Sequence, residues 1–173
     1  MNDLFEGLVG EKAQSRESQP PINIKAYFDG ACEPKNPGGT ASFGAVVFKD
    51  GKRVWDCSRL FVPQKGRELE TSNNVAEYCG FIAILDWLNL QGWTAEAVIV
   101  YGDSKLVIEQ MFGHWRIKKG FYVPLAWEAK QKLRNFKRLR GCWIPREENG
   151  IADELSKAEL LKAGVEFRIQ PNP

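Results

Sequence analysis

The sequence predicts one α/β domain in which helices pack on a mixed β-sheet. Two observations carry this prediction. Three runs of strand-forming residues follow one another near the start of the chain, and helical and strand patterns alternate after them. The predicted order is βββαβααβα, which joins an antiparallel meander to strands that need helical crossovers. The 173 residues are 43% hydrophobic, which is enough apolar material for a core.

The three opening strands are predicted at 22–31, 40–49 and 52–62. Pro20 and Pro21 precede the first strand, and Gly30 marks a turn near its end. A segment rich in Pro and Gly connects it to the second strand, and Asp50-Gly51 is a strong hairpin signal before the third. These turn signals predict an antiparallel meander.

The later elements alternate between helix and strand. Helical spacing of apolar residues, capped by Thr71 or Ser72, predicts a helix that ends near Gln91. The run at 97–101 is apolar throughout and predicts a strand buried on both faces. Further helices are predicted at 104–112, 122–136 and 151–162, with a fifth strand at 138–144.

The ends of the chain differ in composition from the predicted domain at 22–162. Residues 1–21 are polar and are expected to form a flexible leader, and 163–173 form a tail in which apolar residues alternate. No segment has the pattern of a signal peptide or is apolar enough to span a bilayer. The four Cys residues are widely spaced, so we expect free thiols in a cytoplasmic monomer without membrane contact.

Positive charge is concentrated in one part of the sequence. Between Lys105 and Arg146 there are eleven Lys or Arg residues and two acidic residues, although the whole chain has a net charge of only +2. Such a basic region indicates a polyanionic partner such as nucleic acid. A solvated helix face is the alternative explanation.

Four acidic residues fall where a sheet presents ligands. Asp29 ends the first strand, Asp103 follows the fourth, Glu77 lies in the first turns of a helix, and Asp153 begins the last helix. In α/β sheets, ligands gather beyond the ends of the central strands. Taken alone, Asp29-Gly30 is more typical of a turn than of a ligand site.

Four converging carboxylates would repel one another and raise each other's pKa values. Hard divalent cations remove this cost, and a ligand set of oxygen atoms alone favours magnesium or manganese. Two such ions about 3.5–4 Å apart form a typical site of phosphoryl-transfer nucleases. The pattern therefore indicates a metal-dependent nuclease.

Five segments of the chain form an ordered set: YFDGA (27–31), NPGG (36–39), TSNNVAEYCG (71–80), YGDSKLVIEQ (101–110) and REENGIADELS (146–156). In order and spacing they resemble the motifs of type 1 ribonuclease H (ribonuclease HI). The resemblance covers about residues 22–160. It implies a ribonuclease H-like fold with sheet order 3-2-1-4-5 and hydrolysis of the RNA strand of RNA–DNA hybrids, leaving 5′-phosphate and 3′-hydroxyl ends. It also implies that Asp29, Glu77, Asp103 and Asp153 are catalytic ligands of two Mg²⁺ or Mn²⁺ ions.

The resemblance also implies contacts with the hybrid. Asn36, Asn73 and Asn74 match residues that contact its minor groove, and Ser72 matches a residue that holds a phosphate of the DNA strand. Glu77 would additionally contact a 2′-hydroxyl group. Local capping and turn formation are the alternative roles of Asn36 and Ser72.

Two departures place the chain in a branch without the loop His and the basic protrusion of other members. The loop at 143–150 contains no His, and Arg146 or Glu147 is the expected substitute. The only His, His114, is interpreted as a surface or packing residue.

The second departure is the short connection at 114–124, which replaces the basic protrusion. Trp115, Arg116, Lys118 and Lys119 would form a reduced version of it, with an aromatic platform and phosphate contacts. Alternatively, Trp115 simply covers the core, and the basic helix around Lys130 is merely solvated.

Two other functions remain open at this point. The same fold serves nucleases with other substrates, such as double-stranded RNA. A non-catalytic module that binds hybrids is the alternative of a different class. A requirement for magnesium would separate a nuclease from such a binder.

Overall fold

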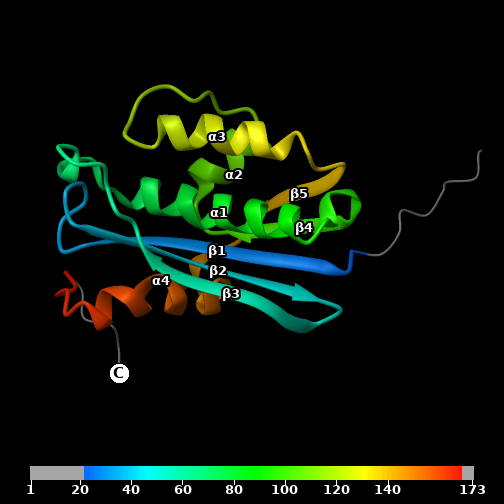
Figure 1. Cartoon of the computed structure of the whole chain (residues 1–173), viewed down its shortest axis with the longest axis horizontal. Helices are drawn as coiled ribbons and strands as arrows, with labels where there is room; N and C mark the ends of the chain where they lie inside the picture. The colour runs from blue at the N-terminus through cyan, green and yellow to red at the C-terminus, as the bar shows by residue number, and fades with distance from the viewer. Residues whose placement is uncertain (1–21, 169–173) are drawn as a thin grey trace, which may run out of the picture.

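The computed structural model describes residues 22–168, and its central element is a five-stranded sheet with the order β3-β2-β1-β4-β5 (Figure 1). β2 pairs antiparallel with both β1 and β3, whereas β4 runs parallel to both β1 and β5. The predicted fold and element order are confirmed. The strands are β1 (Ile24–Glu33), β2 (Thr40–Lys49), β3 (Lys52–Leu60), β4 (Ala97–Gly102) and β5 (Arg138–Trp143).

Four helices cover the sheet unequally. α1, α2 and α3 lie on one face, and α4 lies alone on the other (Figure 1). Short 3-10 turns connect some elements at Glu68–Glu70, Trp93–Ala95 and Arg146–Glu148. The helices are α1 (Asn73–Leu90), α2 (Lys105–Met111), α3 (Val123–Leu133) and α4 (Gly150–Lys162).

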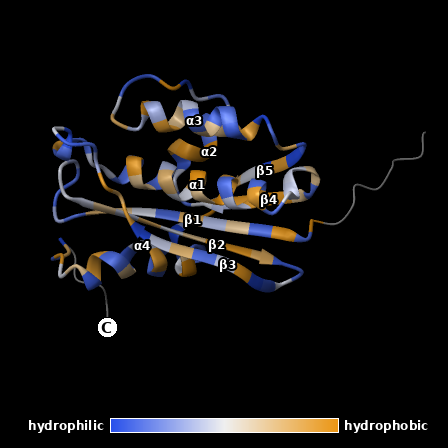
Figure 2. Cartoon of the chain, in the orientation of Figure 1, coloured by the Kyte–Doolittle hydropathy of each residue, from blue (hydrophilic) through white to orange (hydrophobic). Residues whose placement is uncertain are grey.

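The main core lies between the sheet and the three helices on its first face. α1 is buried on most sides because it is enclosed by the sheet and by α3, which packs across it. Figure 2 shows apolar colour concentrated on α1, α2 and β4 in the middle of this layer. Ser72 caps α1, and its Oγ accepts a hydrogen bond from Val75 N at 3.2 Å.

β1 is longer than predicted, because its pairing with β2 continues past Gly30 to Glu33. Gly30 is therefore not a turn residue. A Cβ at this position would lie 2.3 Å from Glu77 N, so glycine permits the close approach of α1 to β1. The parallel pairing of β1 with β4 ends at Phe28 opposite Gly102. Asp29 thus follows the end of the parallel ladder, although it lies inside its strand.

The prediction that the fourth strand is buried on both faces was wrong. Val98 and Val100 are buried in the main core, whereas Ile99 and Tyr101 on the opposite face are only partly covered. The reason is that α4 packs on β1, β2 and β3 and leaves this part of the sheet open.

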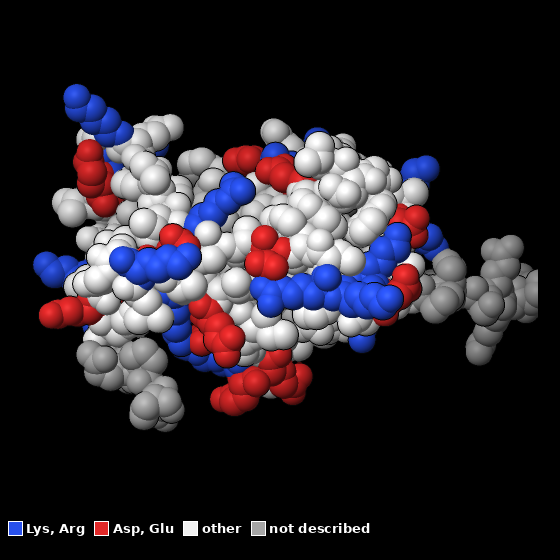
Figure 3. Space-filling view, turned by 60° about the horizontal axis from the view of Figure 1, so that its bottom comes forward, with Lys and Arg blue, Asp and Glu red and all other residues white. Residues whose placement is uncertain are grey.

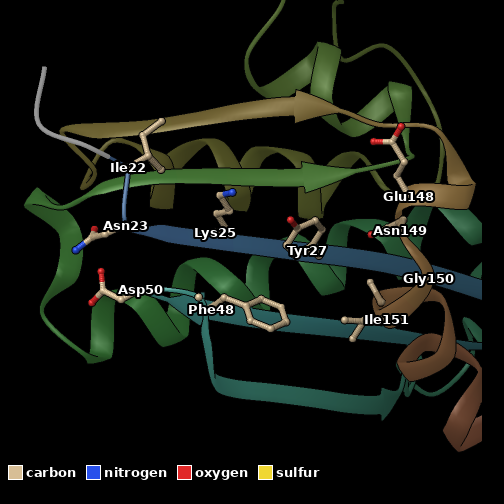
Figure 4. Close-up of a pocket in the computed structure, with 12 residues that line it drawn as sticks. Ile22, Asn23, Lys25, Tyr27, Phe48, Asp50, Glu148, Asn149, Gly150 and Ile151 are labelled. Carbon is tan, nitrogen blue, oxygen red and sulfur yellow. The ribbon is translucent and has the colours of Figure 1, made fainter.

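On the same face of the sheet as α4, a hollow of about 690 Å³ lies over β1 and β2, next to the start of α4 (Figure 4). Lys25, Tyr27 and Phe48 form its floor, and the first turn of α4 closes one end. The ring of Tyr27 stacks on that of Tyr101 with the centroids 4.9 Å apart. None of the four predicted metal ligands lines this hollow, so we place the candidate site elsewhere.

The described part of the tail, 163–168, forms no strand and is attached to β1 by Arg168. Its guanidinium pairs with Glu33 at 2.9 Å and donates to Cys32 O at 3.0 Å. The leader at 1–21 lies outside the described residues, as do the last five residues. Within residues 22–168 no helix combines the length and apolar character that a membrane crossing requires.

Candidate metal and nucleic-acid site

Three of the four predicted acidic residues come together at the end of the parallel ladder. Asp29, Glu77 and Asp103 each present a carboxylate oxygen, and these oxygens lie within 4.8 Å of one another. β1 supplies Asp29, the second turn of α1 supplies Glu77, and Asp103 follows β4 directly. The Asp29 and Glu77 side chains are almost fully buried, at 5% and 4% exposure. We call these three residues the carboxylate triad.

Burial and mutual repulsion act together on the triad. Burial raises the pKa of Asp29 to about 7, and the charges of Asp103 and Asp153 add to this shift. A hydrogen bond from Ser156 and the charge of Arg146 act in the opposite direction. The pKa of Glu77 also lies well above its ordinary value, chiefly because of burial and then because of Asp29 and Asp103. The triad is therefore an unfavourable arrangement of negative charge without a cation.

The donor atoms fit a hard divalent cation. Glu77 Oε1 accepts a hydrogen bond from Asn73 Nδ2 at 3.3 Å, but Glu77 Oε2 is buried without a partner in the described part of the chain. A buried carboxylate oxygen is costly unless something binds it. A set of oxygen ligands with no Cys or His nearby suits magnesium or manganese. The triad residues would hold such an ion.

Asp153 lies outside the triad and is neutralised by the protein itself. Arg146 Nη2 and Lys157 Nζ approach its carboxylate oxygens at 2.8 and 2.6 Å. Burial raises the pKa of Asp153, but the hydrogen bonds from Lys157 and Arg146 outweigh this and hold it below its ordinary value. Asp153 is thus a charged carboxylate beside the triad, with two cations already in contact.

Sequence reasoning missed two residues that position the triad. Asn149 is buried, and its Nδ2 donates to Phe28 O at 2.9 Å and to Asp103 Oδ1 at 2.8 Å. Ser156 Oγ donates to Asp29 Oδ2 at 2.5 Å. In the sequence, Asn149-Gly150 resembles an ordinary helix start, and nothing local connects Ser156 with a residue 127 positions earlier.

The predicted hybrid-contacting residues gather around the start of α1, one turn from Glu77. Asn36 Oδ1 accepts a hydrogen bond from Asn73 N at 3.0 Å, and Ser72 caps the helix. The capping roles of Asn36 and Ser72 are therefore confirmed. Asn74 is exposed and faces no protein partner in residues 22–168. A capped helix end of this kind also suits an anionic ligand.

The connection between α2 and α3 exposes its aromatic and basic side chains. Trp115 is 47% exposed, so it does not serve to cover the core. Lys118, Lys119 and His114 are exposed as well. This arrangement leaves the predicted platform open to a partner.

Two other basic residues of the segment at 105–146, Lys132 and Arg146, are paired with acidic groups. Lys132 on α3 contacts Asp86 at 2.5 Å and Glu128 at 3.5 Å. On the face that Figure 3 shows, basic and acidic side chains are interspersed. The charge of the basic segment is therefore partly compensated within the fold, most clearly on α3.

The strand order and the acidic residues at the ends of neighbouring parallel strands define a ribonuclease H-like domain. Residues 27–159 match the model of a protein family described as "Reverse transcriptase-like". This match covers most of the chain, and the chain belongs to that family.

Two curated relatives match about the same length of this chain, but this match is a very different share of each relative's own length. The bifunctional protein Rv2228c of Mycobacterium tuberculosis (strain H37Rv) is 40% identical over 138 residues, which are 80% of this chain and 36% of the relative. The chain thus spans about a third of that protein. The putative hydrolase EbsB of Enterococcus faecalis is 29% identical over 139 residues, 80% of this chain and 95% of the relative.

Solved structures share the fold over most of their length. The N-terminal RNase H domain of the M. tuberculosis protein superposes with a TM-score of 0.68 at 32% identity, covering 82% of this chain and 96% of that domain. LC11-RNase H1, solved in complex with an RNA/DNA hybrid, superposes with a TM-score of 0.70 at 30% identity. The match covers 81% of this chain and 98% of that one. RNase H1 from Halobacterium salinarum superposes with a TM-score of 0.68 at 28% identity, and the match covers 80% of this chain and 98% of that one.

Proposed function

We propose that this protein is an endoribonuclease that hydrolyses the RNA strand of RNA–DNA hybrids and leaves 5′-phosphate and 3′-hydroxyl ends. The observation that carries the proposal is the buried carboxylate triad, which lacks a paired cation among the described residues. Its similarity to ribonucleases H, one of them solved with a hybrid, supports the substrate class.

In this proposal Asp29, Glu77, Asp103 and Asp153 bind two Mg²⁺ or Mn²⁺ ions. When bound, the ions would lower the pKa of an attacking water and stabilise the charge that develops on the leaving oxygen. Asn149 and Ser156 hold Asp103 and Asp29 in fixed orientations through their hydrogen bonds. Pre-positioned ligands of this kind avoid reorganisation during the reaction.

The remaining residues recognise the substrate and complete the site. Asn36, Ser72, Asn73 and Asn74 would contact the hybrid beside Glu77, where minor-groove 2′-hydroxyl groups distinguish RNA from DNA. Trp115, Lys118 and Lys119 would contact the backbone of the duplex farther away.

The chain fits a branch of type 1 ribonucleases H without the loop His. Arg146, with Glu147 beside it on an exposed 3-10 turn, takes the place of that His. The Arg146–Asp153 pair sets a cation at the edge of the triad, where it would face a phosphate group. We propose that the protein acts as a monomer.

The test is cleavage of an end-labelled RNA–DNA hybrid in magnesium, in manganese and in a chelator. An RNA duplex and a DNA duplex of the same sequence are the controls. We expect cutting of the hybrid alone, only with metal, and products whose RNA fragments carry 5′-phosphate groups.

Each other outcome identifies a different function. Hybrid binding without cutting in either metal would indicate a non-catalytic binding module. Equal cutting of the RNA duplex would indicate a nuclease with another specificity. Hybrid cutting that persists in the chelator would exclude the triad as the metal site.

A further inference from the structure

We propose that Gln110 is a positioning residue that holds the connection at 113–121 in a shape ready to contact nucleic acid. This inference rests on the proposed function, because it concerns how the hybrid is gripped. Gln110 belongs to α2 and is only 3% exposed, and none of its side-chain hydrogen bonds in the described residues reaches the triad.

Both ends of the Gln110 amide are used. Its Oε1 accepts a hydrogen bond from the hydroxyl of Tyr78 at 2.6 Å. Its Nε2 donates to the backbone oxygen of Arg116 at 3.1 Å and to the hydroxyl of Tyr122 at 3.3 Å. A buried amide with all these partners is a strong constraint, because each lost bond leaves a buried polar group unsatisfied.

The partners of Gln110 belong to three different parts of the fold. Tyr78 follows the triad residue Glu77 directly on α1, and Tyr122 is the residue immediately before α3. Their rings stack with centroids 5.5 Å apart and an interplanar angle of 8°. The third partner, Arg116, lies in the connection itself. One side chain therefore ties the connection to the helix that carries Glu77.

The connection needs this attachment because it has no regular secondary structure. Among the described residues, its other fixed points are three backbone hydrogen bonds near its two ends and the side chain of Ile117, which packs against the core. Gly113 N and Trp115 N donate to Glu109 O at 3.1 and 3.2 Å, and Gly120 O accepts from Val123 N at 3.2 Å. Between and beside these points it exposes Trp115, Arg116, Lys118 and Lys119. Ordering such a segment before binding lowers the entropy lost when it grips the duplex.

The variant Gln110→Met tests this role, since it keeps the length of the side chain and removes its hydrogen bonds. We expect the Kd for the hybrid, measured in a chelator so that no cleavage occurs, to rise about tenfold. The kcat in magnesium at saturating hybrid should change less than about twofold, because no group at the triad is altered.

Tyr122→Phe is the matched control in the same buried cluster. It removes one hydrogen bond of Gln110 but leaves the bond to Arg116 intact. We expect both Gln110→Met and Tyr122→Phe to lower the melting temperature, because each removes a buried hydrogen bond. The Kd of Tyr122→Phe for the hybrid should stay within about twofold of wild type. Should Gln110→Met fail to fold, Gln110→Asn serves in its place, because the shorter amide stays polar but cannot reach both sides.

A second readout does not depend on activity. Arg116, Lys118 and Lys119 are sites for trypsin, so brief digestion with mapping of the cuts reports how well the connection is held. Cutting after these three residues should accelerate in Gln110→Met and not in Tyr122→Phe. Faster cutting throughout the chain would show only general destabilisation and would overturn the inference.

The two proposals fail in different ways. A wild-type protein that neither binds nor cuts the hybrid overturns the proposed function. A wild-type protein that binds it, with equal affinity in Gln110→Met and unchanged digestion of the connection, overturns the role of Gln110 alone.

Discussion

The carboxylate triad and Asp153 lie at the same edge of the sheet, yet their charges are handled in opposite ways. Asp153 has Arg146 and Lys157 within 2.8 Å, and its pKa is lowered. Asp29 and Glu77 have hydrogen bonds from neutral side chains, and their pKa values are raised. The protein therefore neutralises one acidic residue by itself, whereas the other three have no salt bridge to a basic side chain among the described residues.

This difference separates a stabilising interaction from a binding site. A paired carboxylate contributes to folding, whereas a group of unpaired buried carboxylates reduces stability until a ligand binds. Substitutions in the carboxylate triad and at Asp153 should therefore have opposite effects on stability.

The largest effect is expected from Asp103→Asn and Asp29→Asn. Each should reduce hybrid cleavage about 1,000-fold or more, because a missing metal ligand removes several kcal/mol of stabilisation from the transition state. Each should also raise the melting temperature in a chelator, because one repelling charge is gone. Cleavage by a labelled-hybrid assay and thermal unfolding are the two measurements.

Asp50→Asn is the control for these variants, since Asp50 is an exposed acidic residue in a hairpin remote from the triad. It should leave cleavage and stability near their wild-type values. Wild-type cleavage by Asp103→Asn or Asp29→Asn would remove the triad from the mechanism.

The stability of the metal-free protein should fall between pH 4 and pH 7. The ordinary pKa of Asp29 is 3.8, and in the folded protein it is about 7. Over this range the unfolded chain has lost the proton that the folded protein still holds, so rising pH favours unfolding by an amount on the order of a few kcal/mol. Glu77 acts in the same direction.

Melting temperatures measured from pH 4 to pH 8 in a chelator and in magnesium test this linkage. Magnesium should flatten the decline, because it binds only the folded, ionised triad. Asp29→Asn should reduce the decline in the chelator. An equally steep decline in that variant would assign the effect to other groups.

Asp153→Asn should have a smaller effect on cleavage and the opposite effect on stability. We expect cleavage to fall about 10–100-fold, and the free energy of unfolding at pH 7 to fall by roughly 1–2 kcal/mol because Lys157 and Arg146 lose a charged partner. The lowered pKa means that this contribution is present above pH 3.8 and is lost as pH falls through the folded pKa.

Glu154→Gln, an exposed neighbour on α4, is the matched control for Asp153→Asn. Chemical denaturation at pH 7 should distinguish the two variants. A stability gain in Asp153→Asn would place Asp153 with the triad and remove the contrast.

The smallest effect is expected from His114→Ala. His114 is exposed on the connection, so cleavage should stay within about twofold and stability within about 0.5 kcal/mol of wild type. Initial rates of hybrid cleavage at several pH values are sufficient to test this. A hundredfold loss would show that this residue takes the part of the missing loop His.

The sequence predicted the fold because its local signals agree with one another. Asp50-Gly51, the cap Ser72 and the apolar run before Asp103 each mark a boundary that the structure shows within a few residues. The largest shift is at α3, which ends at Leu133 because the next residues form a turn in which Phe136 N donates to Leu133 O.

The parts of the site that escaped prediction depend on contacts across the sheet. Gly30 looked like a turn residue, because the sequence does not show that α1 would press against it. The hydrogen bonds from Asn149 and Ser156 to Phe28, Asp103 and Asp29 each span at least 46 positions. Asp153 pairs with Lys157, four residues later on α4, and with Arg146, seven residues earlier, but the sequence does not show that it lies outside the triad.

α4 has a consequence for the order in which the domain becomes competent during translation. This helix and the residue before it provide Asn149, Asp153 and Ser156, and they are the last part of the fold to leave the ribosome. Until then the sheet has one bare face, and neither Asp29 nor Asp103 has its hydrogen-bond donor. In the proposed mechanism the triad is therefore fully positioned only after α4 has packed on the sheet, so activity on hybrids would arrive in a single late step.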